Sequence, residues 1–224
     1  MSHQLFGAGI RNEAIKPLPL KQDLNYSMVE LGDRLFHDVR LSQDNTVSCA
    51  NCHQLSTGGT DDQPKSIGVG GAKGGIKAPT VYNSGFNFVQ FWDGRAESLE
   101  EQAAGPVHNP LEMASNWGQV IGKLQRDPEM VSAFEEVFSG EITPQAIVDA
   151  IAEFERSLVT VNSPFDRWLR GDEKAIDAFE LWGYQLFKSY GCISCHQGVN
   201  VGGNLYAYMG AMGDYFADRG QKIT

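Results

Sequence analysis

The pattern C-x-x-C-H occurs twice in the sequence, at residues 49–53 and 192–196, and the two copies use all four cysteines. This pattern is the attachment signature of c-type haem. Two thiols separated by two residues add to the two vinyl groups of one porphyrin, and the histidine that follows lies under the iron as its axial ligand. The sequence therefore predicts a redox protein with two covalently attached haems. The predicted attachment residues are Cys49, Cys52, His53, Cys192, Cys195 and His196.

Two other uses of the cysteines are weaker. A structural zinc ion could take all four thiolates, but the two pairs lie much farther apart than the roughly 12–20 residues of common zinc modules. Redox-active disulfides of the thioredoxin kind would need each C-x-x-C to follow a strand, and neither pair does. Neither alternative explains the histidine that follows each pair.

The charge of the chain bears on its partners. The 224 residues include 18 Lys+Arg and 28 Asp+Glu, for a formal net charge of −10 and an isoelectric point near 4.9. An acidic chain without a basic cluster is a poor ligand for nucleic acid, and no apolar stretch approaches the roughly 20 residues of a membrane span. We therefore expect small molecules, or proteins with a basic docking face, as partners.

The N-terminus bears on the cellular location. Residues 1–4 have neither the basic region nor the apolar core of a signal peptide. Covalent haem attachment generally belongs outside the cytoplasm. We therefore expect an exported protein from which the signal peptide has been removed.

Hydrophobic residues recur at helical spacing along the chain, and no segment alternates convincingly as a strand. One helix is expected from about Tyr26 to Phe36, and a short one over 97–104 that stops at Gly105-Pro106. His108 then falls on a loop. Further helices are expected over 117–124, from Asp127-Pro128, from Thr143-Pro144, and from an Asp172 N-cap to Phe187. The fold class is mainly α.

The organisation around the two motifs is repeated. Leu35-Phe36 precedes the first motif and Leu186-Phe187 precedes the second, each at the end of an apolar helix. A module used twice indicates two similar domains. With a boundary at Asn162-Ser163-Pro164, we expect an irregular arm over 1–20, an N-terminal domain over 21–162 and a C-terminal domain over 163–224.

Three residues outside the motifs have both a structural and a functional interpretation. Trp92, in a polar loop, is either an aromatic anchor or a bridge for electrons between cofactors. Arg95 is suited to pair with a haem propionate, because a guanidinium binds a carboxylate through two hydrogen bonds. Glu112 is either a solvated surface charge or, if a haem pocket buries it, a group that moves protons.

Four further residues are candidates for the remaining iron ligands. His37 lies at the end of a predicted helix, where a structural role is favoured, whereas His108 could lie near an iron or a propionate. Met209 and Met212 follow the second motif and could supply a sulfur ligand or pack against the porphyrin.

Taken together, the sequence resembles the bacterial di-haem cytochrome c peroxidase family, which includes the MauG-like proteins. The similarity runs from about Leu31 to Phe216. The segments that carry it are 35–42 (LFHDVRLS), 78–80 (APT) with Asn83, 91–95 (FWDGR), 102–106 (QAAGP), 109–113 (NPLEM), 165–171 (FDRWLRG) and 191–196 (GCISCH) with Gly202-Gly203. The resemblance implies two cytochrome c-like domains with one haem each.

The family reduces hydrogen peroxide to water in the periplasm, with electrons from a small cytochrome or copper protein. The resemblance implies that His53 lies at the peroxidatic iron and His196 at the iron that receives electrons. Trp92 would lie between the two haems as a route for electrons. Gln102 and Glu112 would line the peroxide pocket, with Glu112 moving a proton between the two oxygens.

Three departures from the family pattern matter. Many members have a histidine in the glycine-rich loop that blocks the peroxidatic iron, and here Val69 stands there, which predicts either an open site or closure by another residue such as His108. Lys77 stands where the family often has a calcium-ligating Asn, which puts calcium in doubt. Family chains normally continue past Thr224, so the C-terminal domain is expected to be incomplete.

Three functions remain in view. The first is hydrogen peroxide reduction, fed by a small cytochrome c or a cupredoxin. The second is a MauG-like oxidase that acts on a protein or an organic substrate, and the third is a di-haem electron carrier or sensor without catalysis. An acid–base residue such as Glu112 favours the two enzyme readings, because a pure carrier needs none. The sequence leaves open whether the chain forms a homodimer.

Overall fold

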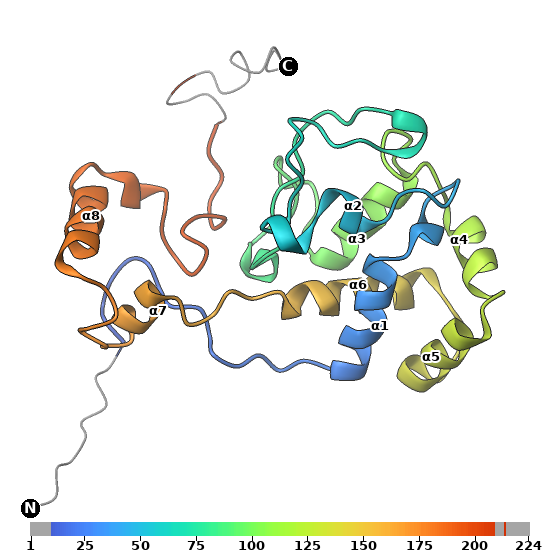
Figure 1. The fold of residues 1–224 in the computed structure, drawn as a ribbon, viewed down its shortest axis with the longest axis horizontal. Helices are drawn as coiled ribbons and strands as arrows, with labels where there is room; N and C mark the ends of the chain where they lie inside the picture. Colours follow the sequence, from blue (N-terminus) through green and yellow to red (C-terminus); the bar gives the residue numbers. More distant parts are fainter. Residues whose placement is uncertain (1–9, 209–212, 214–224) are drawn as a thin grey trace, which may run out of the picture.

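The computed structural model describes residues 10–208 and 213. In this part of the chain the secondary structure is helical, with isolated β-bridges and no strand, which confirms a mainly α protein (Figure 1). The helices are α1 (Tyr26–Phe36), α2 (Cys49–Cys52), α3 (Leu99–His108), α4 (Trp117–Leu124), α5 (Pro128–Phe138), α6 (Pro144–Ser157), α7 (Pro164–Leu169) and α8 (Ala178–Ser189). Short 3-10 turns lie at Val39–Leu41, Leu55–Thr57, Val69–Gly71, Ser84–Phe86 and Cys192–Ser194. No helix in this part is both long and apolar enough to cross a membrane.

Two of the predicted helix starts are confirmed. The Asp127 carboxylate accepts hydrogen bonds from the first backbone N–H groups of α5, and the Thr143 hydroxyl caps α6 in the same way. In both helices proline takes the first position, where no intrahelical N–H bond is lost. Local capping chemistry therefore sets these two boundaries.

The prediction that a helix stops at Gly105-Pro106 is wrong. Helix α3 continues through Pro106 to His108, which therefore ends a helix and does not lie on a loop. Proline removes only one N–H donor, and the last turn gains replacement bonds, because Asn109 N–H donates to the carbonyls of Gly105 and Pro106 and Met113 N–H also donates to Pro106.

The predicted start of the last helix is also wrong. Helix α8 begins after Asp177, whose carboxylate caps it while Glu180 reaches back to the Asp177 N–H. Asp172 instead accepts a hydrogen bond from the Lys174 N–H in a preceding turn. The reciprocal cap at Asp177 satisfies the N–H groups of Asp177, Phe179 and Glu180 at the start of α8. The short helix α7, which starts at the expected boundary, was not foreseen.

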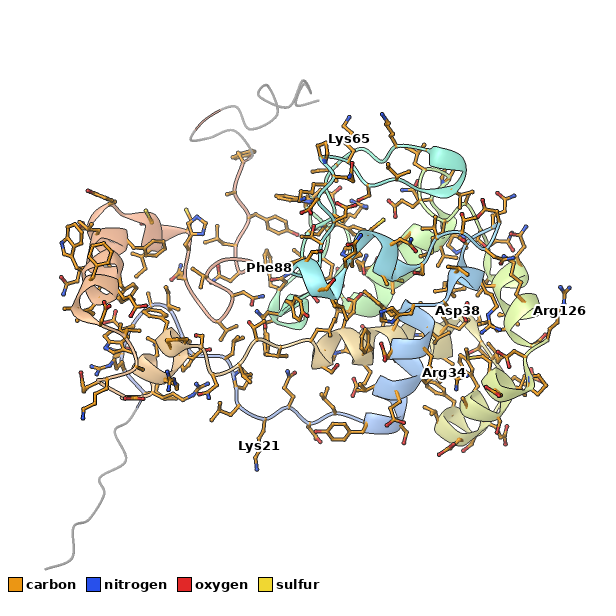
Figure 2. The ribbon with its side chains drawn as sticks, in the orientation of Figure 1. Lys21, Arg34, Asp38, Lys65, Phe88 and Arg126 are labelled. Atoms are coloured by element: carbon orange, nitrogen blue, oxygen red, sulfur yellow. The ribbon has the colours of Figure 1, made fainter. Side chains whose placement is uncertain are left out.

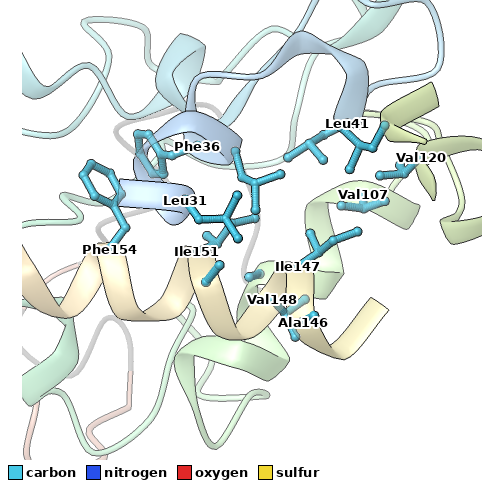
Figure 3. Packing of buried hydrophobic residues seen from close by; sticks show 14 of the residues in the cluster. Leu31, Phe36, Leu41, Val107, Val120, Ala146, Ile147, Val148, Ile151 and Phe154 are labelled. Atoms are coloured by element: carbon cyan, nitrogen blue, oxygen red, sulfur yellow. The ribbon is translucent and has the colours of Figure 1, made fainter. Parts of the chain in front are cut away.

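The main hydrophobic core forms where α1 crosses α6 (Figure 3). Leu31, Phe36 and Ile151 are almost completely buried there, and the ring centroids of Phe36 and Phe154 lie 5.2 Å apart. Gly32 lies at the crossing point, and a Cβ atom there would lie 1.9 Å from the carbonyl oxygen of Ala150. The close approach of the two helices therefore requires glycine at position 32.

Replacing Gly32 with alanine is expected to lower the free energy of unfolding by about 3 kcal/mol, because the added methyl group forces α1 and α6 apart. Gly122 on α4 is the matched control, because a Cβ there meets nothing within 4 Å. Gly122→Ala should instead raise stability by about 0.5–1 kcal/mol. Urea unfolding of both variants measures the difference, and equal stabilities would contradict the close crossing.

A second, smaller core contains Ile15, Trp168, Leu169 and Tyr184. Ile15 comes from the irregular arm, which bends around α7 and α8 before it reaches α1 (Figure 1). The arm is held there by Arg11, whose backbone N–H donates to Leu169 O at 2.7 Å and whose guanidinium lies 4.5 Å from the Trp168 ring centroid. The arm thus belongs to the core that precedes the second C-x-x-C-H motif, although it lies next to α1 in sequence.

Candidate haem sites

The first C-x-x-C-H motif forms α2 and the turn that ends it. Ser48 and Asn51 make a reciprocal cap at the start of α2, and the His53 N–H closes it by donating to Cys49 O at 2.9 Å. The two cysteines are not joined to each other by a disulfide. Burial raises the pKa of the Cys49 thiol, which is packed against the main core.

The imidazole of His53 is oriented by backbone carbonyl oxygens. Its Nδ1 lies 3.0 Å from Pro79 O and 3.3 Å from Gly59 O, which leaves Nε2 as the nitrogen available to a metal. Burial lowers the pKa of His53, so the neutral ring, which is the form that binds iron, is favoured. A proximal iron ligand needs this tautomer and this restraint.

The second motif repeats the geometry of the first. The His196 N–H donates to Cys192 O at 2.9 Å, and its Nδ1 lies 3.0 Å from Val201 O. Phe187, at the end of α8, has its ring centroid 6.2 Å from that of His196, and the corresponding distance from Phe36 to His53 is 6.5 Å. The sequence repeat is therefore also a structural repeat, because each histidine has the same kinds of backbone bond, carbonyl partner and phenylalanine neighbour.

One cavity, of about 710 Å³, gathers the predicted residues of the first site. Helix α2 supplies Cys52, α3 supplies Gln102, and the loops 74–80 and 90–95 close the sides. The predicted site residues that line it are Cys52, His53, Trp92, Arg95, Gln102 and Glu112. Residues from α2, α3, the two loops and the turn that contains Glu112 thus meet at one place.

Two acidic residues, Asp93 and Glu112, line this cavity, and only Glu112 was predicted as a site residue. Burial raises the pKa of the Glu112 carboxyl, and the nearby positive charge of Arg95 and a 2.7 Å hydrogen bond from Asn109 Nδ2 partly offset the effect. Glu112 is therefore partly buried in the cavity wall, which agrees better with the haem-pocket interpretation than with a fully solvated surface charge. A carboxyl with a raised pKa exchanges protons nearer to neutral pH than an exposed one.

Trp92 and Lys77 join two walls of the cavity. The Trp92 Nε1–H donates to Lys77 O at 3.1 Å, and the Lys77 ammonium donates to the backbone carbonyls of Asp61 and Gln63. Lys77 stands where the family often has a calcium-ligating Asn. Its positive charge is bonded to backbone carbonyl oxygens there. Arg95 forms an ion pair with Asp93, and its guanidinium carbon lies 3.5 Å from the Phe91 ring centroid.

The residues that line the cavity fit a haem. Its surface combines apolar groups with the imidazole of His53 and the guanidinium of Arg95, which suit an iron and a propionate respectively. The Ser66 hydroxyl faces the same cavity beside the Cys52 sulfur and, among the described residues, has no nitrogen or oxygen partner. It can therefore still exchange a hydrogen bond with a polar group bound in the cavity.

Sequence reasoning missed two features near the cavity. Phe91 has φ = +65°, an unusual conformation for a bulky residue, and a Cβ at Gly105 would lie 3.0 Å from its ring. Glu155 on α6 is buried near Cys49, and burial raises the pKa of this carboxyl to about 8. Only the tertiary structure brings either residue to the motif.

The other candidate ligands lie elsewhere. Val69, which stands in place of the family's loop histidine, packs against the main core, and its backbone N–H donates to Glu112 O. The His108 ring lies edge-on against Trp117, outside the cavity lining. His108 is therefore not placed to close the cavity. His37 Nδ1 bonds to Asp33 on its own helix, in agreement with a structural role. The remaining candidates, Met209 and Met212, lie outside the described residues.

A mainly helical chain that repeats a helix, a C-x-x-C-H turn and an oriented histidine has the organisation of a c-type cytochrome. The family model for di-haem cytochrome c peroxidase matches residues 26–174. The chain belongs to this family, and membership implies haem as its cofactor.

The relatives include curated peroxidases and a solved MauG-like structure. Cytochrome c peroxidase Ccp of Escherichia coli (strain K12) is 52% identical over 206 residues, covering 92% of this chain and 44% of that protein. Cytochrome c551 peroxidase of Nitrosomonas europaea is 48% identical over 210 residues, covering 93% and 63%. A MauG-like protein associated with microbial copper homeostasis has a TM-score of 0.73 and 28% identity, over 84% and 58%. The chain spans about half the length of the relatives it matches.

Proposed function

We propose that this chain carries the peroxide-reducing haem site and a second haem site of a di-haem c-type peroxidase, in two cytochrome c-like domains. The observation that carries the proposal is the cavity in which His53, Gln102 and Glu112 meet. Similarity to proteins named cytochrome c peroxidase supports the same reaction class. In the reaction, hydrogen peroxide takes up two electrons and two protons and gives two molecules of water.

The cysteines and histidines have distinct roles in this proposal. Each cysteine pair forms two thioether bonds to one haem, and His53 and His196 bind the irons through Nε2. When bound, haem supplies the redox chemistry and an iron atom at which peroxide can be reduced. Arg95 binds a propionate of the haem. The bound haem can also give the Ser66 hydroxyl a hydrogen-bond partner.

Glu112 and Gln102 act on the peroxide molecule itself. The ionised Glu112 carboxylate takes the proton from one peroxide oxygen and delivers it to the other, so that the second oxygen leaves as water. The Gln102 amide can donate to one oxygen and accept from the other hydroxyl, which keeps the O–O bond in place. Trp92, whose side chain lines this cavity, is the proposed route for electrons from the second haem.

The partners and location of the protein follow from its charge and cofactor. We propose a small cytochrome c or a cupredoxin with a basic face as the electron donor, because the chain has a formal net charge of −10. The proposed covalent haem attachment supports a location in the periplasm. Calcium has no role in the proposal. The Lys77 ammonium donates to the carbonyl oxygens of Asp61 and Gln63, and its charge would repel a cation there.

Steady-state assays test the function. Peroxide and a reduced small cytochrome should give rapid cytochrome oxidation that depends on both reactants. A MauG-like oxidase, favoured by the fold shared with the solved MauG-like protein, would instead oxidise a protein or organic substrate and leave the cytochrome reduced. A protein that carries two haems but oxidises neither kind of substrate would be an electron carrier or a sensor.

The charge of Arg95 should set the acid limb of the pH–rate profile. Glu112 must be ionised to take the first proton, so turnover falls as the pH drops below its pKa. Arg95 lowers that pKa, and Arg95→Gln should therefore move the acid limb of kcat to higher pH. Arg126→Gln is the control, because Arg126 is exposed and points away from the cavity (Figure 2). Identical acid limbs in all three proteins would contradict this role.

A further inference from the structure

The turn that follows the second C-x-x-C-H motif is bonded to a loop of the first site. The side-chain amide of Asn200 donates to Asn83 O at 2.8 Å and to Asn87 Oδ1 at 2.7 Å. The backbone N–H of Phe88 donates to Gly203 O at 3.0 Å, and Figure 2 shows Phe88 where the two parts of the chain face each other. Three hydrogen bonds thus join the turn over 200–203 to the loop over 83–88.

The loop that receives these bonds is itself anchored. Asn83 has φ = +61°, and its N–H donates to Leu158 O at 2.8 Å just beyond the end of α6. Its side-chain amide exchanges two further hydrogen bonds with Thr160, at 2.8 and 2.9 Å. Ser84 and Gln90, which follow in the same loop, line the first cavity. The loop therefore has a fixed position relative to the main core.

The turn over 200–203 also holds the second histidine. The carbonyl that orients His196, 3.0 Å from its Nδ1, belongs to Val201, the residue next to Asn200. Val201 has φ = +53°, a strained conformation for a β-branched residue that persists only where the surroundings impose it. Gly203 packs so closely that a Cβ there would lie 2.4 Å from Asn87 Oδ1. Contacts from the first part of the chain therefore hold the strained turn, together with the local bond from the Gly202 N–H to Gln197 O at 2.9 Å.

We propose that Asn200 is a positioning residue for His196, through which the loop over 83–88 sets the electronic character of the second iron ligand. The inference rests on the proposed haem at the second motif. A carbonyl that accepts from the histidine N–H fixes the ring and makes the other nitrogen a stronger electron donor. A stronger donor stabilises oxidised iron and lowers its reduction potential. By contrast, His53 is oriented by Gly59 and Pro79, which lie in its own part of the chain.

The test is a redox titration of the holoprotein, followed by its absorption spectrum. Asn200→Ala removes the side-chain bonds to Asn83 O and Asn87 Oδ1, which loosens the turn that holds the Val201 carbonyl against His196 Nδ1. The reduction potential of the second haem should therefore rise while that of the first stays unchanged. Asn204→Ala is the matched control, because Asn204 is exposed in the same segment and makes none of these bonds. The control should leave both potentials unchanged.

A second variant approaches the same contact from the other side. Asn87→Ala removes one acceptor of the Asn200 amide from a residue that belongs to the first part of the chain. It should raise the potential of the second haem in the same direction, and the double variant should give less than the sum of the two shifts. The result keeps its meaning if Asn200→Ala fails to fold.

The experiment distinguishes failure of the proposed function from failure of the positioning role. If the wild-type holoprotein carries no haem on Cys192 and Cys195, the proposed function fails at that site. If the haem is present and neither Asn200→Ala nor Asn87→Ala moves its potential, the positioning role is overturned while the proposed function stands.

Discussion

Glu112→Gln is expected to lower kcat for peroxide reduction by about 10²–10⁴-fold, the usual contribution of a positioned acid–base group. Glutamine keeps the size of the side chain and can still accept the hydrogen bond from Asn109 Nδ2, but it cannot take a proton from peroxide. Stopped-flow or steady-state oxidation of a reduced donor by peroxide measures the loss. Both haem absorption spectra should stay nearly the same.

The control for this variant is Glu136→Gln. Glu136 lies on the exposed face of α5, outside the cavity, and its replacement should leave kcat unchanged. A Glu112→Gln protein with full turnover and intact haems would show that no acid–base step depends on Glu112. The carrier or sensor interpretation would then be favoured over both enzyme interpretations.

Removing both thiols of the second motif is expected to eliminate turnover driven by a protein donor. Cys192→Ala with Cys195→Ala should lower the intact mass by one haem, because thioether attachment needs these thiols. The haem on Cys49 and Cys52 should remain, since its cavity shares no cysteine with the second site. Mass spectrometry counts the haems, and the cytochrome oxidation assay measures the turnover.

The reciprocal variant provides the comparison. Cys49→Ala with Cys52→Ala should also remove one haem and abolish peroxide reduction, whatever reductant is supplied. If the second-motif variant still oxidises the donor at the normal rate, electrons do not enter at His196. Loss of both haems from either double variant would mean that the two sites do not load independently.

Much of this organisation could be predicted without coordinates. The helix starts at Asp127 and Thr143 depend on capping by neighbouring residues, so the local sequence was enough to locate them. The C-x-x-C-H pairs depend equally on local spacing. The end of α3 and the start of α8 were predicted wrongly, because each is decided by which of several competing hydrogen bonds the folded chain completes.

The cavity could not be predicted from the sequence, because residues from separate elements form it. Glu112 could be read as a surface charge or as a buried acid, and only the approach of α2, α3 and the loops 74–80 and 90–95 buries it beside Arg95. The sequence makes His108 a candidate ligand, but the position of α3 puts its ring against that of Trp117.

By itself the sequence determined the two haem-attachment motifs, the family and the mainly helical class, because these depend on residue type and short-range spacing. The tertiary structure alone decided that the arm packs beside α8 and that Asn200 connects His196 to the loop of the other site. Such contacts join residues far apart along the chain. No local pattern encodes them, and they form only when the packing of the whole chain brings their partners together.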